Sequence, residues 1–231
     1  MTRILVFGTS YVDSASKRFV VQQWANLNSS LSPDCDLMLV DSASTHPLPS
    51  GVRVAQLGDN IGHLARGGQD GWGRAFCVGL QLGLEWDYDW VVHVESDSLL
   101  RHSVRAIVDD LRTKRHSRGC ASVPVGGTRR PEKNWIETGL MFFEAEYLRR
   151  SNLIARYNWR DCEPKRRYPH CPEWWVHGIV HPEMYLLPLN AERGDLGQIT
   201  ADNVDGYDWV THVGPDVASA FVRSCDSAIH R

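Results

Sequence analysis

The sequence predicts an α/β fold in which helices flank a mainly parallel central sheet. Short apolar runs, beginning with Ile4-Leu5-Val6-Phe7, alternate with longer segments in which apolar residues recur at helical spacing. Parallel strands need a helix or a long loop to connect them, so this alternation is typical of a doubly wound sheet. Several apolar runs also end in polar residues, which is where such sheets bind ligands.

The elements expected from this pattern follow one another without an internal repeat or a clean linker. In the helix expected at 14–29, for example, Phe19, Val20, Trp24 and Leu27 lie on one side. We therefore expect a single domain over residues 1–231. Strands are expected at 4–7, 36–40, 52–57, 90–94, 121–125, 140–143, 184–189 and 209–213, with helices at 14–29, after a glycine-rich loop at 66–71, at 99–112, 146–156 and 217–230, and a loop-like stretch at 157–182.

Composition and charge exclude several classes of function. The 231 residues carry a net charge of −3 and a pI near 6.4, so no broad basic surface is expected to bind nucleic acid. No stretch approaches the ~20 apolar residues of a transmembrane segment. The chain enters its first strand without a signal peptide, and its six cysteines have no paired spacing. We expect reduced thiols and a cytoplasmic location.

The most informative motif is an acidic tripeptide after a buried strand. The apolar run 90–94 leads directly into Glu95-Ser96-Asp97. Two carboxylates at that place are costly unless a cation meets them, and a divalent ion bridging to phosphate oxygens would suit them. The tripeptide therefore favours a nucleotide-diphosphate substrate. The alternative is a solvated turn in which Ser96 caps the next helix and Asp97 lies in its first turn.

Polar residues also follow the first three expected strands. Thr9, Tyr11, Asp41 and Asn60 would gather with the tripeptide on one edge of a parallel sheet. Asp41 can accept a hydrogen bond from a ribose hydroxyl or a base, and Tyr11 can stack on a base. Arg74 can contact a diphosphate in a bidentate manner. The alternatives are ordinary turn residues and a surface arginine on an amphipathic helix.

Three segments together resemble the nucleotide-sugar half of GT-A glycosyltransferases. They are Asp59-Asn60-Ile61-Gly62, the stretch 73–80 with Arg74, and the stretch 89–97 that ends in Glu95-Ser96-Asp97. The resemblance implies a Rossmann-like GT-A fold, with about 1–100 binding the nucleotide sugar and about 101–231 binding the acceptor. The stretch 135–143 resembles the segment that lines the acceptor side. The implied substrates are a nucleoside-diphosphate sugar, with a UDP-sugar favoured, and a glycan or other hydroxyl acceptor.

The same resemblance implies roles for individual residues. It makes Asp97 a direct ligand of Mn²⁺ or Mg²⁺, followed by His212 and then Glu95, which stands where the family usually has aspartate. Glu137 becomes the candidate base of an inverting enzyme, although it would equally suit a contact with the donor sugar or an exposed position. The residues expected to contact the nucleotide sugar are Thr9, Tyr11, Asp41, Asn60, Gly62, Arg74, Glu95, Ser96 and Asp97.

Two other functions remain open. The loop 126–131 resembles the glycine-rich loop of sugar-phosphate nucleotidylyltransferases, but it follows the fifth expected strand, whereas theirs follows the first. A non-catalytic relative that binds a nucleotide sugar or a glycan is the second alternative. The residues do not distinguish an inverting from a retaining enzyme.

Overall fold

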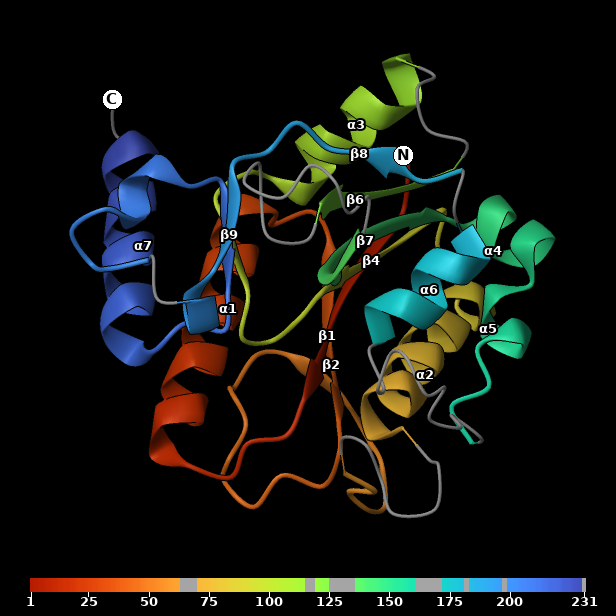
Figure 1. The fold of residues 1–231 in the computed structure, drawn as a ribbon, viewed down its shortest axis with the longest axis horizontal. Coiled ribbons are helices and arrows are strands. Elements are labelled where there is room, and N and C mark those ends of the chain that lie inside the picture. Colours follow the sequence, from red (N-terminus) through yellow and green to blue (C-terminus); the bar gives the residue numbers. More distant parts are fainter. Residues whose placement is uncertain are drawn as a thin grey trace.

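The protein is built around a seven-stranded mixed sheet with helices on both faces (Figure 1). The computed structural model describes residues 1–62, 70–114, 119–124, 136–160, 172–180, 183–196 and 199–229. The expected glycine-rich stretch 66–69 and the loop 126–131 lie outside this part of the chain. In spatial order the strands are β3 (Arg53–Gln56), β2 (Asp36–Asp41), β1 (Ile4–Ser10), β4 (Trp90–Val94), β7 (Ile136–Glu144), β6 (Cys120–Pro124) and β8 (Tyr185–Leu186).

The predicted parallel arrangement of the early strands is confirmed. β1 pairs in parallel with both β2 and β4, and β2 pairs in parallel with β3. Ser10 at the end of β1 lies opposite Asp41 at the end of β2. The carboxyl ends of these strands therefore share one edge of the sheet, as the sequence pattern predicts for Thr9, Asp41 and Asp97.

β7 is the strand that makes the sheet mixed. It runs antiparallel to both of its neighbours, β4 and β6, while β6 and β8 pair in parallel. The sequence predicts only 140–143 as this strand, but its pairing extends from Ile136 to Glu144. The longer strand carries Glu137 beside β6, where the Ser122 hydroxyl donates to the Glu137 carbonyl over 2.7 Å.

A second sheet of three short strands stands beside the first. Its central strand β10 (Trp209–Thr211) pairs antiparallel with β5 (Leu99–Leu100) and parallel with β9 (Ala191–Arg193). The helix expected from residue 99 therefore begins only at Val104, as α3 (Val104–Lys114), because Leu99 and Leu100 pair with β10. Ser96 does not cap that helix. Its hydroxyl donates instead to the carbonyl of Thr9 over 2.7 Å.

Separate apolar cores lie on the two faces of the large sheet. One face packs against α1 (Ala15–Leu31), α3 and the closing helix α7 (Pro215–Ile229), with Trp24 and Phe221 fully buried. The opposite face packs against α2 (Gly71–Glu85), α4 (Ala145–Ser151), α5 (Leu153–Arg156) and α6 (Pro172–Val180) (Figure 1). None of the helices in the described part of the chain is long and apolar enough to cross a membrane.

The later half departs most from the sequence pattern. The single helix expected at 146–156 is divided into α4 and α5 at Asn152, whose φ of 53° is left-handed. The stretch expected to be a loop contains α6, and the strand expected at 184–189 has only two paired residues. The sequence pattern predicts no strand at 191–193, where the structure has β9.

Glycines bring α2 directly against the large sheet. A Cβ added at Gly79 would lie 2.2 Å from Cε2 of Phe7 on β1, and one at Gly83 would lie 2.4 Å from Cγ2 of Val91 on β4. The apolar face of α2 packs on the sheet, with Phe76 and Leu80 buried and Trp72 stacked on Phe76. This close packing sets the start of α2 beside the ends of the parallel strands.

Candidate active site

Two adjoining cavities open at the edge where the parallel strands end. They have volumes of about 400 Å³ and about 250 Å³. Thr9, Tyr11, Lys17 and Glu95 border both of them. The larger cavity is also lined by Ser16, Val20, Val21, Ser96, Asp97, His212 and Val213, and the smaller by Ser10, Ser42, Asn60, Gly62, Gly71, Trp72 and Ala75.

This grouping brings together most of the residues predicted to contact the nucleotide sugar. They reach the cavities from the ends of β1 and β4 and from the loop after β3, and the predicted metal ligand His212 joins them from the end of β10. Asn60 shapes its loop by accepting a 2.9 Å hydrogen bond from the Gly62 amide, and Gly62 has a φ of 78° that favours glycine. What these residues bind stays a prediction.

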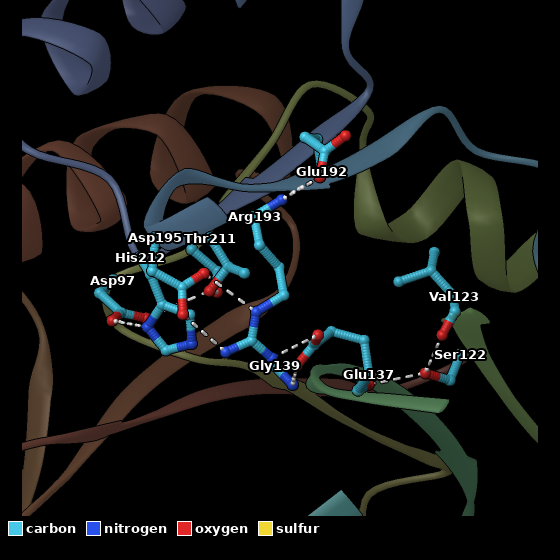
Figure 2. Close-up of polar contacts among 11 residues, drawn as sticks. Asp97, Ser122, Val123, Glu137, Gly139, Glu192, Arg193, Asp195, Thr211 and His212 are labelled. Atoms are coloured by element: carbon cyan, nitrogen blue, oxygen red, sulfur yellow. Dashed lines mark hydrogen bonds and ion pairs between the residues drawn. The ribbon is translucent and has the colours of Figure 1, made fainter. Parts of the chain in front are cut away.

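Asp97 and His212 form an ion pair at the wall of the larger cavity (Figure 2). Nδ1 of His212 lies 2.9 Å from Oδ2 of Asp97, across 115 residues of chain. The Thr211 hydroxyl donates to Oδ1 of Asp97 over 3.4 Å and accepts from the Ser98 hydroxyl over 2.8 Å. The hydrogen bond that His212 donates to Asp97, together with the negative charges of Asp97 and Glu95, raises the pKa of His212 to about 9. In this pair, the imidazole therefore carries a proton at neutral pH.

The side chains at this wall supply some, but not all, of the ligands that a divalent cation needs. Among the described residues, no group of three or more His, Cys, Asp or Glu side chains is arranged to hold a metal ion. Asp97 and His212 supply two adjacent candidate ligands, and Glu95 borders the same cavity. Mg²⁺ and Mn²⁺ commonly complete their coordination with water and substrate phosphates, so two protein ligands are compatible with such an ion. Binding a metal through the imidazole would release its proton.

The buried His93 contacts Thr9, which borders both cavities. Nδ1 of His93 donates to the carbonyl of Thr138 over 2.7 Å, and Nε2 lies 3.4 Å from the hydroxyl of Thr9. Complete burial lowers the pKa of His93 to about 4, despite the opposing hydrogen bond to Thr138 and the charge of Asp97. The neutral ring can therefore donate to Thr138 and accept from Thr9, which fixes the end of β1 against β4.

Two predicted contacts lie away from the cavities. The Asp41 carboxylate is almost fully buried and accepts from Ser10, Gln56 and both the amide and hydroxyl of Ser44. Through these hydrogen bonds, Asp41 holds the loop that follows β2. Arg74 pairs with Asp59, with Nη1 2.6 Å from Oδ1, and borders neither cavity. Direct contacts of Asp41 and Arg74 with a nucleotide stay predictions.

Glu137 belongs to a second charged cluster beside the Asp97–His212 pair (Figure 2). Its side chain is only 2% exposed, and Oε2 lies 3.2 Å from Nη1 of Arg193. Arg193 also forms a bidentate pair with Asp195, with both N–O distances 3.1 Å. The hydrogen bonds from Arg193 lower the pKa of Asp195. Arg193 thus holds a buried carboxylate on one side and an exposed carboxylate on the other.

Sequence reasoning missed Arg193 and Lys17. Arg193 reaches the site because β9 runs parallel to β10, with Arg193 opposite Thr211 in the register. Three residues of strand carry no periodic signal from which this placement could be predicted. Lys17 was detectable in principle, because it lies in the first turn of the helix that follows the first strand.

Known proteins match this chain by their fold and not by their sequence. No protein-family model matches the chain, and no curated protein sequence matches it significantly. The solved structure of WbbM, a bifunctional glycosyltransferase, matches with a TM-score of 0.61 at 10% identity, over 97% of this chain and 49% of WbbM. This chain thus spans about half the length of WbbM.

Two smaller glycosyltransferases match over nearly their whole length. The galactosyltransferase LgtC, in complex with donor and acceptor sugar analogues, has a TM-score of 0.54 at 12% identity, over 97% of this chain and 95% of LgtC. Mouse xyloside xylosyltransferase 1 has a TM-score of 0.53 at 10% identity, over 91% of this chain and 97% of the mouse protein. At these identities the similarity establishes the fold, and the predicted GT-A architecture is confirmed.

Proposed function

We propose that this chain, which has the GT-A fold, is a glycosyltransferase that moves a sugar from a nucleoside-diphosphate sugar to a hydroxyl acceptor. The observation that carries the proposal is the Asp97–His212 pair, which borders a cavity of about 400 Å³ together with Glu95 and the end of β1. A carboxylate after β4 and an imidazole after β10, both bordering the cavity at the ends of the parallel strands, suit a metal-assisted nucleotide site. We favour a UDP-sugar as donor and a glycan as acceptor, and a cytoplasmic location stays a prediction.

The proposed chemistry divides between the two charged clusters. Glycosyl transfer passes through an oxocarbenium-like transition state while a diphosphate departs. A divalent ion would neutralise the charge that develops on the leaving group, and Asp97 and His212, with Glu95, would hold it. Thr9 and Tyr11 border the space for the nucleotide.

Glu137 is the proposed base on the acceptor side. Removal of a proton from the acceptor hydroxyl requires an ionised carboxylate within hydrogen-bonding reach. The Arg193 guanidinium lies 3.2 Å from Oε2 of Glu137 and forms an ion pair with its carboxylate. Because the Glu137 side chain is almost completely buried, the base role also requires the acceptor to reach an oxygen that Arg193 now contacts.

Thermal unfolding with UDP, measured with and without Mn²⁺, tests the proposal, because a ligand of the native state raises its apparent stability. We expect wild-type protein to gain stability with UDP and Mn²⁺ together. Asp97→Ala should lose the metal-dependent part of this gain while its unliganded form stays folded. Asp226→Ala removes an exposed carboxylate on α7 that borders neither cavity, and should behave as wild type.

Retention of the full metal-dependent gain by Asp97→Ala would exclude Asp97 as a ligand. Release of UDP from a UDP-sugar separates an enzyme from a non-catalytic binder. Release of pyrophosphate from a nucleoside triphosphate would instead identify a nucleotidylyltransferase.

A further inference from the structure

Lys17 lies at the two cavities, whereas Arg74, the residue predicted to contact the diphosphate, does not. Its side chain borders both cavities, and it is the only lysine or arginine among the described residues that line them. Arg74 borders neither and pairs with Asp59. A nucleotide in these cavities would therefore meet the ammonium group of Lys17.

The surroundings of Lys17 favour an anion in two ways. Lys17 lies in the first turn of α1, where Ser14 caps the helix by accepting from the Lys17 amide over 3.3 Å. Ser16 and Val20 of the same helix also line the larger cavity. The positive end of the helix dipole therefore lies beside the cavity and adds to the charge of Lys17.

The present partners of Lys17 leave its ammonium group able to move. Nζ lies 2.9 Å from Oδ2 of Asp13 and 5.6 Å from the centre of the Tyr11 ring. The side chains of Lys17 and Asp13 are 54% and 39% exposed. Exposed ion pairs of this kind are weak, so a phosphate group can compete with Asp13 for the ammonium.

The charges across the cavity favour a further cation on the α1 side. Glu95 and Asp97 face the same space, and their carboxylates would repel a diphosphate. A metal ion at Asp97 and His212 would offset this repulsion from one wall, and Lys17 can offset it from the α1 side. Lysine serves as a phosphate ligand by acting as a compact point charge.

We propose that Lys17 binds the diphosphate of the donor nucleotide, an inference that rests on the proposed function. The closing experiment is calorimetric titration of UDP in the presence of Mn²⁺. Lys17→Met should weaken UDP binding by about tenfold or more, the usual effect of losing a hydrogen bond to a charged group. Lys17→Arg should recover most of the affinity. Uridine, which lacks phosphate, should bind wild type and Lys17→Met alike.

Two further variants make the measurement specific. Arg18→Met removes an exposed cation from the same helix that borders neither cavity, and should leave UDP affinity within about threefold of wild type. Arg74→Met tests the competing candidate and should lose less affinity than Lys17→Met. Because Lys17 is exposed, thermal unfolding of unliganded Lys17→Met should match wild type, which separates a binding defect from a folding defect.

Each outcome decides a different question. Equal UDP affinity in wild type and Lys17→Met, or a larger loss in Arg74→Met, would overturn the assignment of Lys17 while leaving the proposed function intact. If wild-type protein binds neither UDP nor GDP in the presence of Mn²⁺, the proposed function is wrong, and the assignment of Lys17 is wrong with it.

Discussion

The parallel strands β1, β2 and β4 and the short strands β9 and β10 bring polar groups to neighbouring positions by different means. The parallel strands end together, so the residues that follow them meet through regular sheet geometry. The short strands contribute Arg193 and His212, which meet Glu137 and Asp97 across 56 and 115 residues of chain. The first region is organised by backbone pairing and apolar packing, and the second depends on individual charged contacts.

Glu137 should give the largest effect on function if the second region carries acceptor chemistry. The proposed base role predicts that Glu137→Gln lowers the rate of transfer by about 10²–10⁴. Glutamine keeps the shape of the side chain but cannot take a proton, and Arg193 keeps both bonds to Asp195, so the fold should persist. Initial rates with donor and acceptor measure the effect, with the exposed Glu146→Gln as control.

The affinity of Glu137→Gln for the donor nucleotide distinguishes the possible roles of Glu137. Calorimetry should find nucleotide binding by Glu137→Gln within a few-fold of wild type. Near-normal transfer would exclude the base role and leave Glu137 as the partner of Arg193. A large loss of donor affinity would reassign Glu137 to the donor sugar.

Arg193 should give the largest effect on stability. Arg193→Met would leave the buried Glu137 carboxylate without this cation, and breaking a buried ion pair on one side costs about 3 kcal/mol. Arg149→Met is the matched control, because its pair with Asp87 has side chains that are 55% and 92% exposed. The control should lose less than about 1 kcal/mol. Urea unfolding measures both, and equal losses would contradict the importance of the Glu137–Arg193 contact.

A smaller effect is expected from backbone packing in the first region. Gly79→Ala would place a methyl group against the Phe7 ring, and we expect a net loss of about 1–2 kcal/mol from overpacking. Gly178→Ala on α6 has no atom within 4 Å of the added Cβ, and should gain up to about 1 kcal/mol of helix propensity. Urea unfolding should therefore give opposite signs. A stabilised Gly79→Ala variant would show that α2 can move away from the sheet.

The contrast also explains which features the sequence could predict. The parallel strands are apolar runs long enough to be recognised, and their direction follows from the helices between them. Leu99 and Leu100 could not be assigned from the sequence, because two apolar residues before a helix give the same pattern whether they continue that helix or pair with β10. Arg193 carried no local signal, since its place depends on β9 pairing with a strand that lies later in the chain.

The candidate cavity was predictable in part for the same reason. Strand-end residues such as Thr9 and Asn60 border it as the alternation predicts. His212 is predicted as a metal ligand only by the resemblance to GT-A enzymes, because the spacing of apolar residues does not single it out. The internal bonds of Asp41 and the pairing of Arg74 with Asp59 depend on side-chain geometry, which a strand pattern does not specify.

The backbone conformation of His212 is one that most residues adopt only at a cost in stability. Its φ of 53° is left-handed, a conformation that costs most residues about 1 kcal/mol and that glycine adopts freely. Gly194 packs closely behind it, since a Cβ there would lie 2.6 Å from the His212 carbonyl oxygen. Glycine at this position would relieve that backbone cost but would also remove the imidazole that pairs with Asp97. Retention of histidine under laboratory selection for heat resistance alone would therefore show that the Asp97 pair outweighs the backbone cost, and its replacement would show the reverse.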